Sequence, residues 1–324
     1  MKIFDNPNFN FIKWRWHAIA VSALIVLAGA VMIAVKGMPL GIDFSGGTAL
    51  VLQFEQAVNE QQVRSALDSI PGDKVVQVIG NANEHQISVR LPQVTTVEQG
   101  ASLEVGSQQI EQTLQKAGLP KATVVKREIV GPVIGADLQR RGVLATLASI
   151  LAITVYIAFR FRPSFAIGAI VATLHDVFVT FAFLRFFNYE LSLNVVAAIL
   201  TITGYSVNDT IVIFDRVREN MRGSRRDSLE AQVNHAVNQT LGRTIITAGT
   251  AFLSVLALYL FGGEALSGFS FTMLVGVVSG TYSTIFIASA IAIILSQKRA
   301  APVAPPAAAV ADGRGRKPKG AKAS

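Results

Sequence analysis

Six apolar stretches limit what this chain can fold into. A membrane-spanning helix needs about 20 mostly apolar residues, and about 17 can suffice. Six stretches reach that length: residues 17–35, 143–159, 165–184, 191–214, 244–263 and part of the uncharged run 265–297. Hydrophobic residues make up 51% of the 324 positions against 15% charged, and the mean hydropathy is +0.45. These values exceed those of soluble domains, so we expect a polytopic α-helical membrane protein with six transmembrane helices.

The distribution of basic residues in the short loops predicts the orientation. Lysine and arginine collect on the cytoplasmic side of membrane proteins. On one side of the six stretches lie Lys2, Lys13, Arg15, Arg160, Arg162, Arg216, Arg226, Lys298 and Arg299. The opposite short loops, 188–190 and 262–264, carry none, although Arg140, Arg141 and Arg185 dissent. We therefore predict a multi-pass protein with both termini in the cytoplasm and the long segment after the first helix outside.

The net charge indicates which partners the chain can have, and the absence of cysteine excludes one kind of chemistry. The formal net charge is +8, and much of it lies in the C-terminal tail. Such a balance fits loops and a tail beside anionic membrane lipid, and we expect no nucleic-acid partner. The chain has no cysteine, which excludes disulfides and thiolate sites but leaves the compartment open.

The chain divides into one soluble domain and a membrane domain. Strand-like and helical patterns between the first two membrane stretches alternate in the order β-α-β-β-α-β, the signature of a ferredoxin-like α+β fold. We expect a cytoplasmic N-terminus over 1–16, the first membrane helix over 17–37, a periplasmic domain over 38–138, the other five membrane helices over 139–298 with a cytoplasmic loop at about 215–242, and a disordered basic tail over 299–324. In the loop, Asp227 and Glu230 have the spacing of a capping box before an amphipathic helix.

An acid inside the fourth apolar stretch is the leading functional candidate. A carboxylate at membrane depth costs a few kcal/mol, so it usually faces a cavity or a partner and marks an ion path. Asp209, with Asn208 beside it and Tyr205 one turn before it, occupies this position. Asp209 lies roughly 9 Å from Asp215 along the helix and cannot easily reach the surface. Its expected partner is Arg243 at the start of the fifth stretch, although Arg243 is equally typical of a positive-inside anchor.

Polar residues also form stripes on three of the predicted helices. These stripes are Thr173, Asp176 and Thr180 beside His175; Thr201, Tyr205 and Asp209; and Arg243, Thr247, Thr250 and Ser254. Together they predict one hydrophilic seam, although stripes of this kind are more often packing contacts between helices. His175 and Asp176 fit either a proton relay or a structural hydrogen-bonded pair. In the sixth stretch Gly276 and Gly280 form a GxxxG pair that favours close helix packing.

Several motifs, in order, carry a resemblance to a known family. They are GIDFSGG from Gly41 through Asp43 and Gly46 to Gly47, EIVGPVIGADL over 128–138, HDV over 175–177, and LTITGYSVNDTIVIFDRVREN over 200–220. Together they resemble SecF, a family of bacterial Sec protein translocase subunits within the resistance-nodulation-division superfamily. The similarity extends over residues 1 to about 298, and GIDFSGG alone would be weak evidence.

The resemblance implies a function in the bacterial inner membrane. Members of this family pair with SecD and use the proton-motive force to assist the export of preproteins, beside the SecYEG channel, SecA and often YajC. It also implies that Asp209 and Arg243 couple ion flow to movement of the periplasmic domain. Whether the coupling ion is H⁺ or Na⁺ stays open.

Two other classes of function are weighed against this one. An independent small-molecule or lipid exporter of the same superfamily also carries intramembrane acids, but this chain has only one six-helix half and one small outer domain. A membrane enzyme is the less favoured class, because the sequence has neither an H-E-x-x-H zinc pattern nor a P-loop. We therefore expect no enzymatic activity, no cofactor and no metal.

Overall fold

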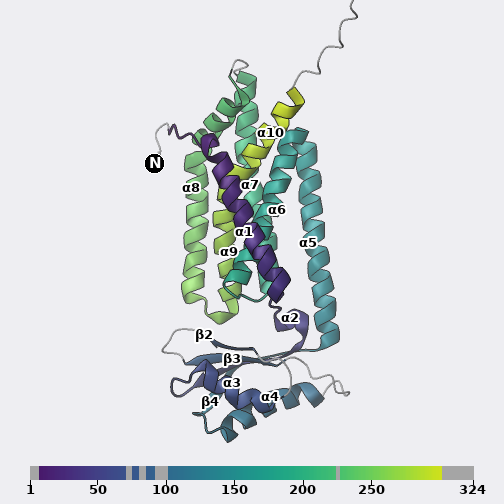
Figure 1. The fold of residues 1–324 in the computed structure, drawn as a ribbon, viewed down its shortest axis with the longest axis vertical. Coiled ribbons are helices and arrows are strands. Elements are labelled where there is room, and N and C mark those ends of the chain that lie inside the picture. The colour runs from purple at the N-terminus through teal and green to yellow at the C-terminus, as the bar shows by residue number, and fades with distance from the viewer. Residues whose placement is uncertain (1–6, 71–74, 80–84, 92–100, 224–226, 301–324) are drawn as a thin grey trace, which may run out of the picture.

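The computed structural model describes residues 7–70, 75–79, 85–91, 101–223 and 227–300. Within these ranges, six helical segments are long and apolar enough to cross a membrane. They are η1 Ile12–Trp14 with α1 Arg15–Lys36, α5 Pro132–Arg160, α6 Pro163–Phe186, α7 Leu193–Gly223, α8 Leu229–Phe261, and α9 Glu264–Ser283 continued by the π-helix η3 Thr284–Ala288 and α10 Ser289–Ala300. Figure 1 shows them as one bundle, with the start of α1 at the end opposite the β-sheet. The six expected helices are thus confirmed, while the expected tail lies outside the described residues from position 301 on.

Three of the membrane helices are longer than the apolar stretches that predicted them. Helix α5 begins at Pro132 and not near 143, because proline suits the first helical position and helix-forming residues follow it. Between α7 and α8, the expected loop at 215–242 is mostly helix in the described residues, since α7 continues to Gly223 and α8 begins at Leu229. The predicted capping box at Asp227 is wrong: Ser228 is the N-cap, and its side chain accepts a hydrogen bond from the Ala231 N–H.

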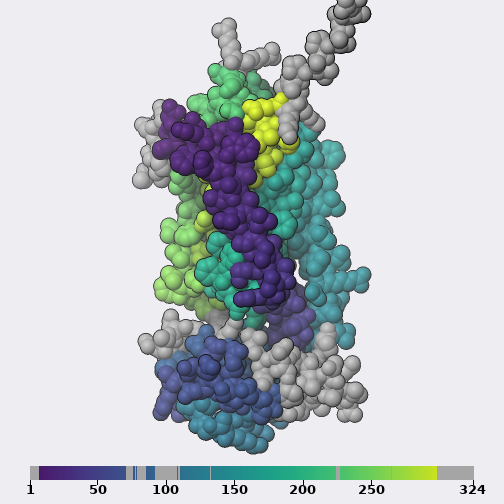
Figure 2. All heavy atoms as spheres, in the orientation of Figure 1, coloured from purple at the N-terminus to yellow at the C-terminus, as the bar shows by residue number. Residues whose placement is uncertain are grey.

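Helices α6, α7 and α9 form the centre of the bundle. About half or more of each apolar window in these helices is buried, against 11% or less in α1, α5 and α8. The close approach of α7 and α9 depends on Gly276 and Gly280, because a Cβ at either position would collide with Ile202 or Ser206 of α7. The predicted GxxxG packing is therefore confirmed. Figure 2 shows α1 crossing the outside of the bundle obliquely; it lies on α6, where Gly29 leaves no room for a side chain against Ala182.

A small antiparallel sheet with two helices lies in the chain between the membrane helices α1 and α5. Its elements are β1 Gly47–Phe54, α3 Glu60–Ala66 with η2 Leu67–Ser69, β2 Val75–Ile79, β3 Gln86–Leu91, α4 Ala101–Lys116 and β4 Ala122–Val130. The strand order is β2-β3-β1-β4, and Leu50 of β1 pairs with Val89 of β3 in the register. The alternating apolar residues of the strands pack on Val63, Leu67 and Ile110, and so build a core of their own.

The sheet lies between its own helices and the membrane bundle. In Figure 1, α3 and α4 cover the side away from the bundle, and the open face of the sheet turns toward the ends of the membrane helices. A short helix that the sequence did not predict, α2 Ile42–Ser45, fills the corner where α1 leads into β1.

Candidate functional site

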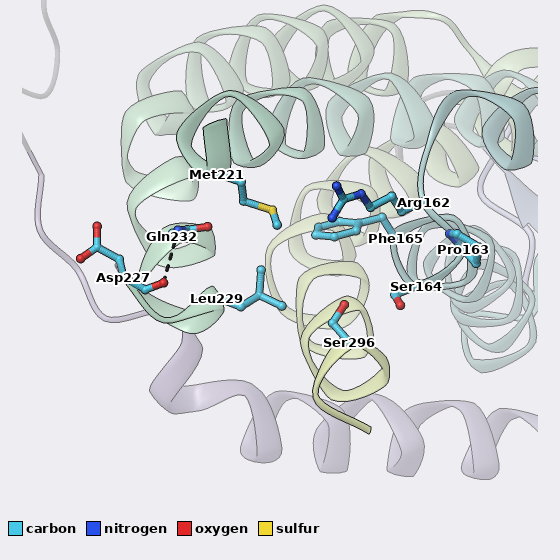
Figure 3. Close-up of a pocket in the computed structure, with 9 residues that line it drawn as sticks. All are labelled: Arg162, Pro163, Ser164, Phe165, Met221, Asp227, Leu229, Gln232 and Ser296. Atoms are coloured by element: carbon cyan, nitrogen blue, oxygen red, sulfur yellow. Dashed lines mark hydrogen bonds between the residues drawn. The ribbon is translucent and has the colours of Figure 1, made fainter. Parts of the chain in front are cut away.

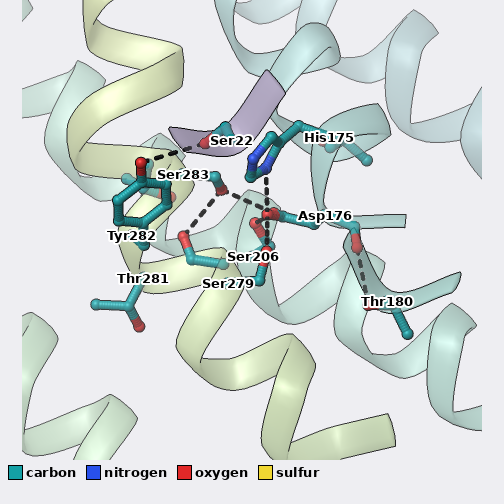
Figure 4. Close-up of polar contacts among 12 residues, drawn as sticks. Ser22, His175, Asp176, Thr180, Ser206, Ser279, Thr281, Tyr282 and Ser283 are labelled. Carbon is teal, nitrogen blue, oxygen red and sulfur yellow. Dashed lines mark hydrogen bonds and ion pairs between the residues drawn. The ribbon is translucent and has the colours of Figure 1, made fainter. Parts of the chain in front are cut away.

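Asp176 is the most completely enclosed charged group of the membrane bundle. It lies in the middle of α6, and its side chain is 1% exposed. Three serine hydroxyls from two other helices donate to its carboxylate: Ser206 of α7 to Oδ2 at 2.5 Å, Ser283 of α9 to Oδ2 at 2.8 Å, and Ser279 of α9 to Oδ1 at 2.7 Å. Figure 4 shows these side chains converging on Asp176. The three central helices are therefore joined through a single carboxylate.

His175 completes the surroundings of Asp176 and links them to α1. Its Nδ1 lies 3.2 Å from Asp176 Oδ1, and the carboxylate requires Nδ1 to carry the proton in this contact. The imidazole ring stacks on Tyr282, whose hydroxyl donates to the carbonyl of Ala18 in α1 at 2.7 Å and accepts from Ser22 at 3.2 Å. His175 Nε2 is buried and has no hydrogen-bond partner among the described residues.

Asp209 has very different surroundings. It lies on α7, partly buried, and its Oδ1 accepts one hydrogen bond, from Thr244 Oγ1 of α8 at 3.0 Å. Its Oδ2 is buried and makes no hydrogen bond within the described part of the chain. Among the described residues, Asp209 therefore has one carboxylate oxygen without a hydrogen bond, whereas both oxygens of Asp176 accept at least one.

The predicted contact between Asp209 and Arg243 is absent among the residues that the structure describes. Arg243 is exposed, and Thr244, the next residue of α8, occupies the place beside the carboxylate instead. Successive helical residues point about 100° apart, so Arg243 and Thr244 face different directions. Tyr205 lies half-buried one turn before Asp209, and Asn208 is exposed on the same helix.

The three polar stripes do not form the single seam that the sequence predicted. The stripe of α6 is buried in the centre of the bundle, where Thr173 and Thr180 donate to backbone carbonyls of their own helix. Thr201 of α7 and the whole stripe of α8 are exposed on the outside. Helical periodicity shows which residues share a face, but it does not say toward which neighbour that face turns.

The GIDFSGG motif lies where the bundle meets the sheet. The N–H of Gly41 donates to the carbonyl of Leu191, and Asp43 Oδ2 accepts from the N–H of Leu193, the first residue of α7. Gly46 and Gly47 have φ values of 70° and 121°, which favour glycine. The motif residues singled out from the sequence therefore lie far along the chain from Asp209 but at the start of the helix that carries it.

Two hollows lie away from both carboxylates. A pocket of about 520 Å³ lies between the α5–α6 and α7–α8 connections. Figure 3 shows the residues that line it, among them Arg162, Phe165, Met221 and Gln232. A larger cleft of about 1270 Å³ lies between the open face of the sheet and the near ends of the membrane helices. Within the described residues, no three His, Cys, Asp or Glu side chains gather as a metal site would require.

Sequence reasoning missed most of the groups that contact the two carboxylates. The charged residue Arg243 was the predicted partner of Asp209, and nothing in the sequence indicated that the adjacent Thr244 would make the contact. Ser206 lies three residues before Asp209, and nothing in its spacing marks it as a donor to another helix. Ser279 and Ser283 were detectable, because they share one face of α9 at a spacing of four residues.

The fold and the site together define a class of protein. Membrane-length helices surround ionisable groups at membrane depth, and an α/β part is attached at one end of the bundle. Such intramembrane acids are typical of transport proteins that respond to ions.

Comparisons with known proteins give the family. Residues 109–298 match the family described as "Protein export membrane protein SecD/SecF, C-terminal", and residues 31–58 match the "SecD/SecF GG Motif". The protein translocase subunit SecF of Escherichia coli O157:H7 is 40% identical over 292 residues, which cover 90% of this chain and 89% of that protein. SecF of Vibrio alginolyticus is 37% identical, with coverage of 88% and 89%. The chain therefore belongs to the SecF family of protein translocase subunits, multi-pass proteins of the bacterial inner membrane.

Solved structures agree with this assignment. The crystal structure of SecDF, a translocon-associated membrane protein from Thermus thermophilus, matches with a TM-score of 0.79 at 34% identity. The match covers 91% of this chain and 39% of that one. A structure of SecDF in a super-membrane-facing form matches with a TM-score of 0.67, covering 40% of its chain. This chain thus corresponds to a part of the longer SecDF proteins.

Proposed function

We propose that this chain is a SecF-type subunit that works with SecD to couple the proton-motive force to protein export across the inner membrane. The main observation in support of this proposal concerns Asp209. Its Oδ2 is buried at membrane depth without a hydrogen bond from any described residue, while Oδ1 has one donor, Thr244. A charged carboxylate in this place is costly, and protonation removes that cost.

A cycle can be written from these contacts. The protonated carboxyl of Asp209 keeps the contact with Thr244 that is seen here and leaves Arg243 at the surface of α8. Loss of the proton creates a charge that attracts the long Arg243 side chain, and the attraction is strong in a medium of low dielectric constant. The resulting shift between α7 and α8 is the proposed link between ion flow and movement. Asn208 and Tyr205 border the site on the same helix.

Asp176 and His175 fit the structural alternative better than a relay. The carboxylate of Asp176 already accepts hydrogen bonds from three serines and lies beside Nδ1 of His175. A carboxyl group with this many donors keeps the helices that supply them in place. We infer that the pair fixes α6 against α7 and α9 while Asp209 takes part in ion coupling.

The partner SecD follows from the polar residues on the outside of the bundle. Thr201 and Asn208 of α7 and Arg243 of α8 are all exposed, although their helices are long enough to cross the membrane. Polar and charged groups facing lipid are unfavourable, so we propose that a second membrane protein covers this face. We propose that this partner is SecD, because the chain matches a part of SecDF, and that SecYEG, SecA, YajC and the exported preprotein complete the assembly.

The proposed topology places both termini in the cytoplasm and the α/β part in the periplasm. The strand order β2-β3-β1-β4 with both helices on one face is that of a ferredoxin-like domain, which supports this part of the proposal. The basic residues near the N-terminus and at Arg160 and Arg162 support the orientation. We also propose that the chain is not an enzyme; hydrolysis of ATP or of a peptide bond by the purified protein would contradict this.

The main test replaces Asp209 by asparagine, which keeps the shape and removes the titration. Inverted membrane vesicles containing the SecD complex are assayed for proton-driven export, and proteoliposomes for ion flux, while pH and sodium are varied separately. We expect Asp209→Asn to lose both activities. The matched control is Asp215→Asn on the same helix, an exposed acid paired with Arg160 at 3.0 Å, which should retain both. Wild-type export by Asp209→Asn would refute the proposed function.

An independent exporter is the second candidate. No observation on this chain favours it, because the exposed polar face of α7 and α8 requires a partner. Transport of a small molecule by the purified chain alone would favour the independent exporter over the SecF-type function.

A further inference from the structure

Three hydrogen bonds join the start of α7 to the GIDFSGG motif and to Pro39, two residues before it. The Leu191 N–H donates to the carbonyl of Pro39 at 2.8 Å, and the Gly41 N–H donates to the carbonyl of Leu191 at 2.8 Å. Asp43 Oδ2 then accepts from the N–H of Leu193 at 2.8 Å. The first N–H groups of a helix lack partners inside it, and their partial positive charge favours a carboxylate. Asp43, in α2, therefore caps a helix more than a hundred residues away in sequence.

The same motif is packed firmly against α5. The Cα of Gly135 approaches the α2 backbone so closely that a Cβ there would lie 3.2 Å from both the Phe44 carbonyl oxygen and the Gly46 nitrogen. Gly46 and Gly47 then turn the chain directly into β1, which begins at Gly47. Only Gly46 therefore separates α2 from β1, one of the two inner strands of the sheet.

A second contact ties the loop before α7 to the sheet. Glu190, in the α6–α7 loop, forms an ion pair with Arg90 of β3, and both side chains are mostly buried. The start of α7 is thus held at two places by the part of the chain that contains the sheet. Helix α7 runs without interruption from Leu193 to Asp209, about 24 Å at 1.5 Å per residue.

We propose that Asp43 is a positioning residue that transmits the movement of α7 to the periplasmic domain. The proposal rests on the proposed function, because it assumes that ion exchange at Asp209 displaces α7. The joint consists of Asp43, Gly41 and the backbone of 191–193, and it stays closed while α7 moves. The GIDFSGG motif then transmits movement: Asp43 holds α7, and Gly46 and Gly47 turn the chain into β1.

The first experiment compares Asp43→Ala with Asp43→Asn in the complex with SecD. Alanine removes the acceptor for the Leu193 N–H, while asparagine keeps an acceptor oxygen and loses only the charge. We expect Asp43→Ala to keep ion flux near the wild-type level and to lose export by about tenfold, the change that corresponds to 1.4 kcal/mol of lost coupling. Asp43→Asn should stay closer to the wild type in export.

Ion flux and export, measured together, distinguish three cases: Asp43 transmits movement, Asp43 only stabilises the helix, or the proposed function itself is wrong. If Asp43→Ala loses ion flux and export in the same proportion as it loses protein, Asp43 is only a stabilising cap and the proposal is overturned. If Asp43→Ala exports normally, the proposal is also overturned. The proposed function is judged separately by Asp209→Asn, which should lose flux and export together.

A disulfide provides a second, independent test. A Cβ built on Gly41 lies 3.4 Å from the Cβ of Ser192, close to the 3.5–4.5 Å typical of disulfides, and the chain has no cysteine to compete. We expect the double variant Gly41→Cys/Ser192→Cys, placed in the Asp43→Ala background, to regain export when oxidised and to lose it again when reduced. In the background with Asp43 intact, the oxidised variant should export as well as the reduced one. Loss of export on oxidation would show that the joint must open, and would overturn the proposal.

Discussion

Replacing Asp176 by alanine should destabilise the bundle, because three serines on two other helices lose their acceptor. In membranes, hydrogen bonds between helices contribute about 0.6 kcal/mol on average and up to about 1.7 kcal/mol. Three such bonds give roughly 2 kcal/mol at the average value. The full cost of three unsatisfied buried hydroxyls would be larger, about 1–3 kcal/mol each. Rotation limits this cost, since Ser283 Oγ already lies 3.2 Å from the carbonyl of Gly280.

We therefore expect Asp176→Ala to lower the free energy of unfolding by about 2–3 kcal/mol. Asp176→Asn should lower it by about 1 kcal/mol, because a serine hydroxyl can accept from the new amide as well as donate to its oxygen. The measurement is equilibrium unfolding of the purified protein in mixed micelles, followed by circular dichroism.

The control for this experiment is Asp215→Ala. Asp215 forms an exposed ion pair with Arg160, and such pairs contribute about 0–1 kcal/mol. If Asp176→Ala unfolded at the same denaturant concentration as the wild type, or no earlier than Asp215→Ala, the idea that this carboxylate joins α6, α7 and α9 would be wrong.

Two further predictions concern packing and the link to the sheet. Gly276→Val should cost about 1–3 kcal/mol of unfolding free energy, because the new side chain collides with Ile202; the control Gly204→Ala, where a Cβ meets nothing within 4 Å, should be neutral or slightly stabilising in the same assay. Replacing Arg90 or Glu190 alone should destabilise the protein more than replacing both, because a single change leaves a mostly buried charge without its partner. A double-mutant cycle measures this coupling, and a coupling energy near zero would contradict it.

The membrane helices could be predicted from the sequence because length and apolarity are local properties. The element order of the α/β part was predictable for a similar reason, since period-2 and period-3.6 patterns arise within single strands and helices. The ends of α5, α7 and α8 were not, because a helix can continue into water once it has formed. Residues such as Arg140 and Arg141 mark the edge of the apolar stretch but do not end the helix.

The surroundings of Asp209 and Asp176 also show what the sequence can and cannot predict. Asp209 and Asp176 stood out in the sequence because a carboxylate in an apolar stretch is costly wherever the helix faces. Their partners did not, since Thr244 replaces the expected Arg243 beside Asp209 and Ser206 reaches Asp176 from another helix. A difference of one residue turns a side chain by about 100° around the helix, and only packing decides which face meets which.

The sequence by itself thus determined the class of the protein, the number of its membrane helices and the presence of two acids within them, because the cost of placing each residue in lipid depends on that residue alone. Only the tertiary structure decided that Asp176 accepts hydrogen bonds from three serines, that Asp209 Oδ2 accepts none from the residues that the structure describes, and that Asp43 caps the helix that carries Asp209. These properties depend on contacts between segments far apart in the chain, and such contacts are fixed by the rotation and depth at which helices pack against one another.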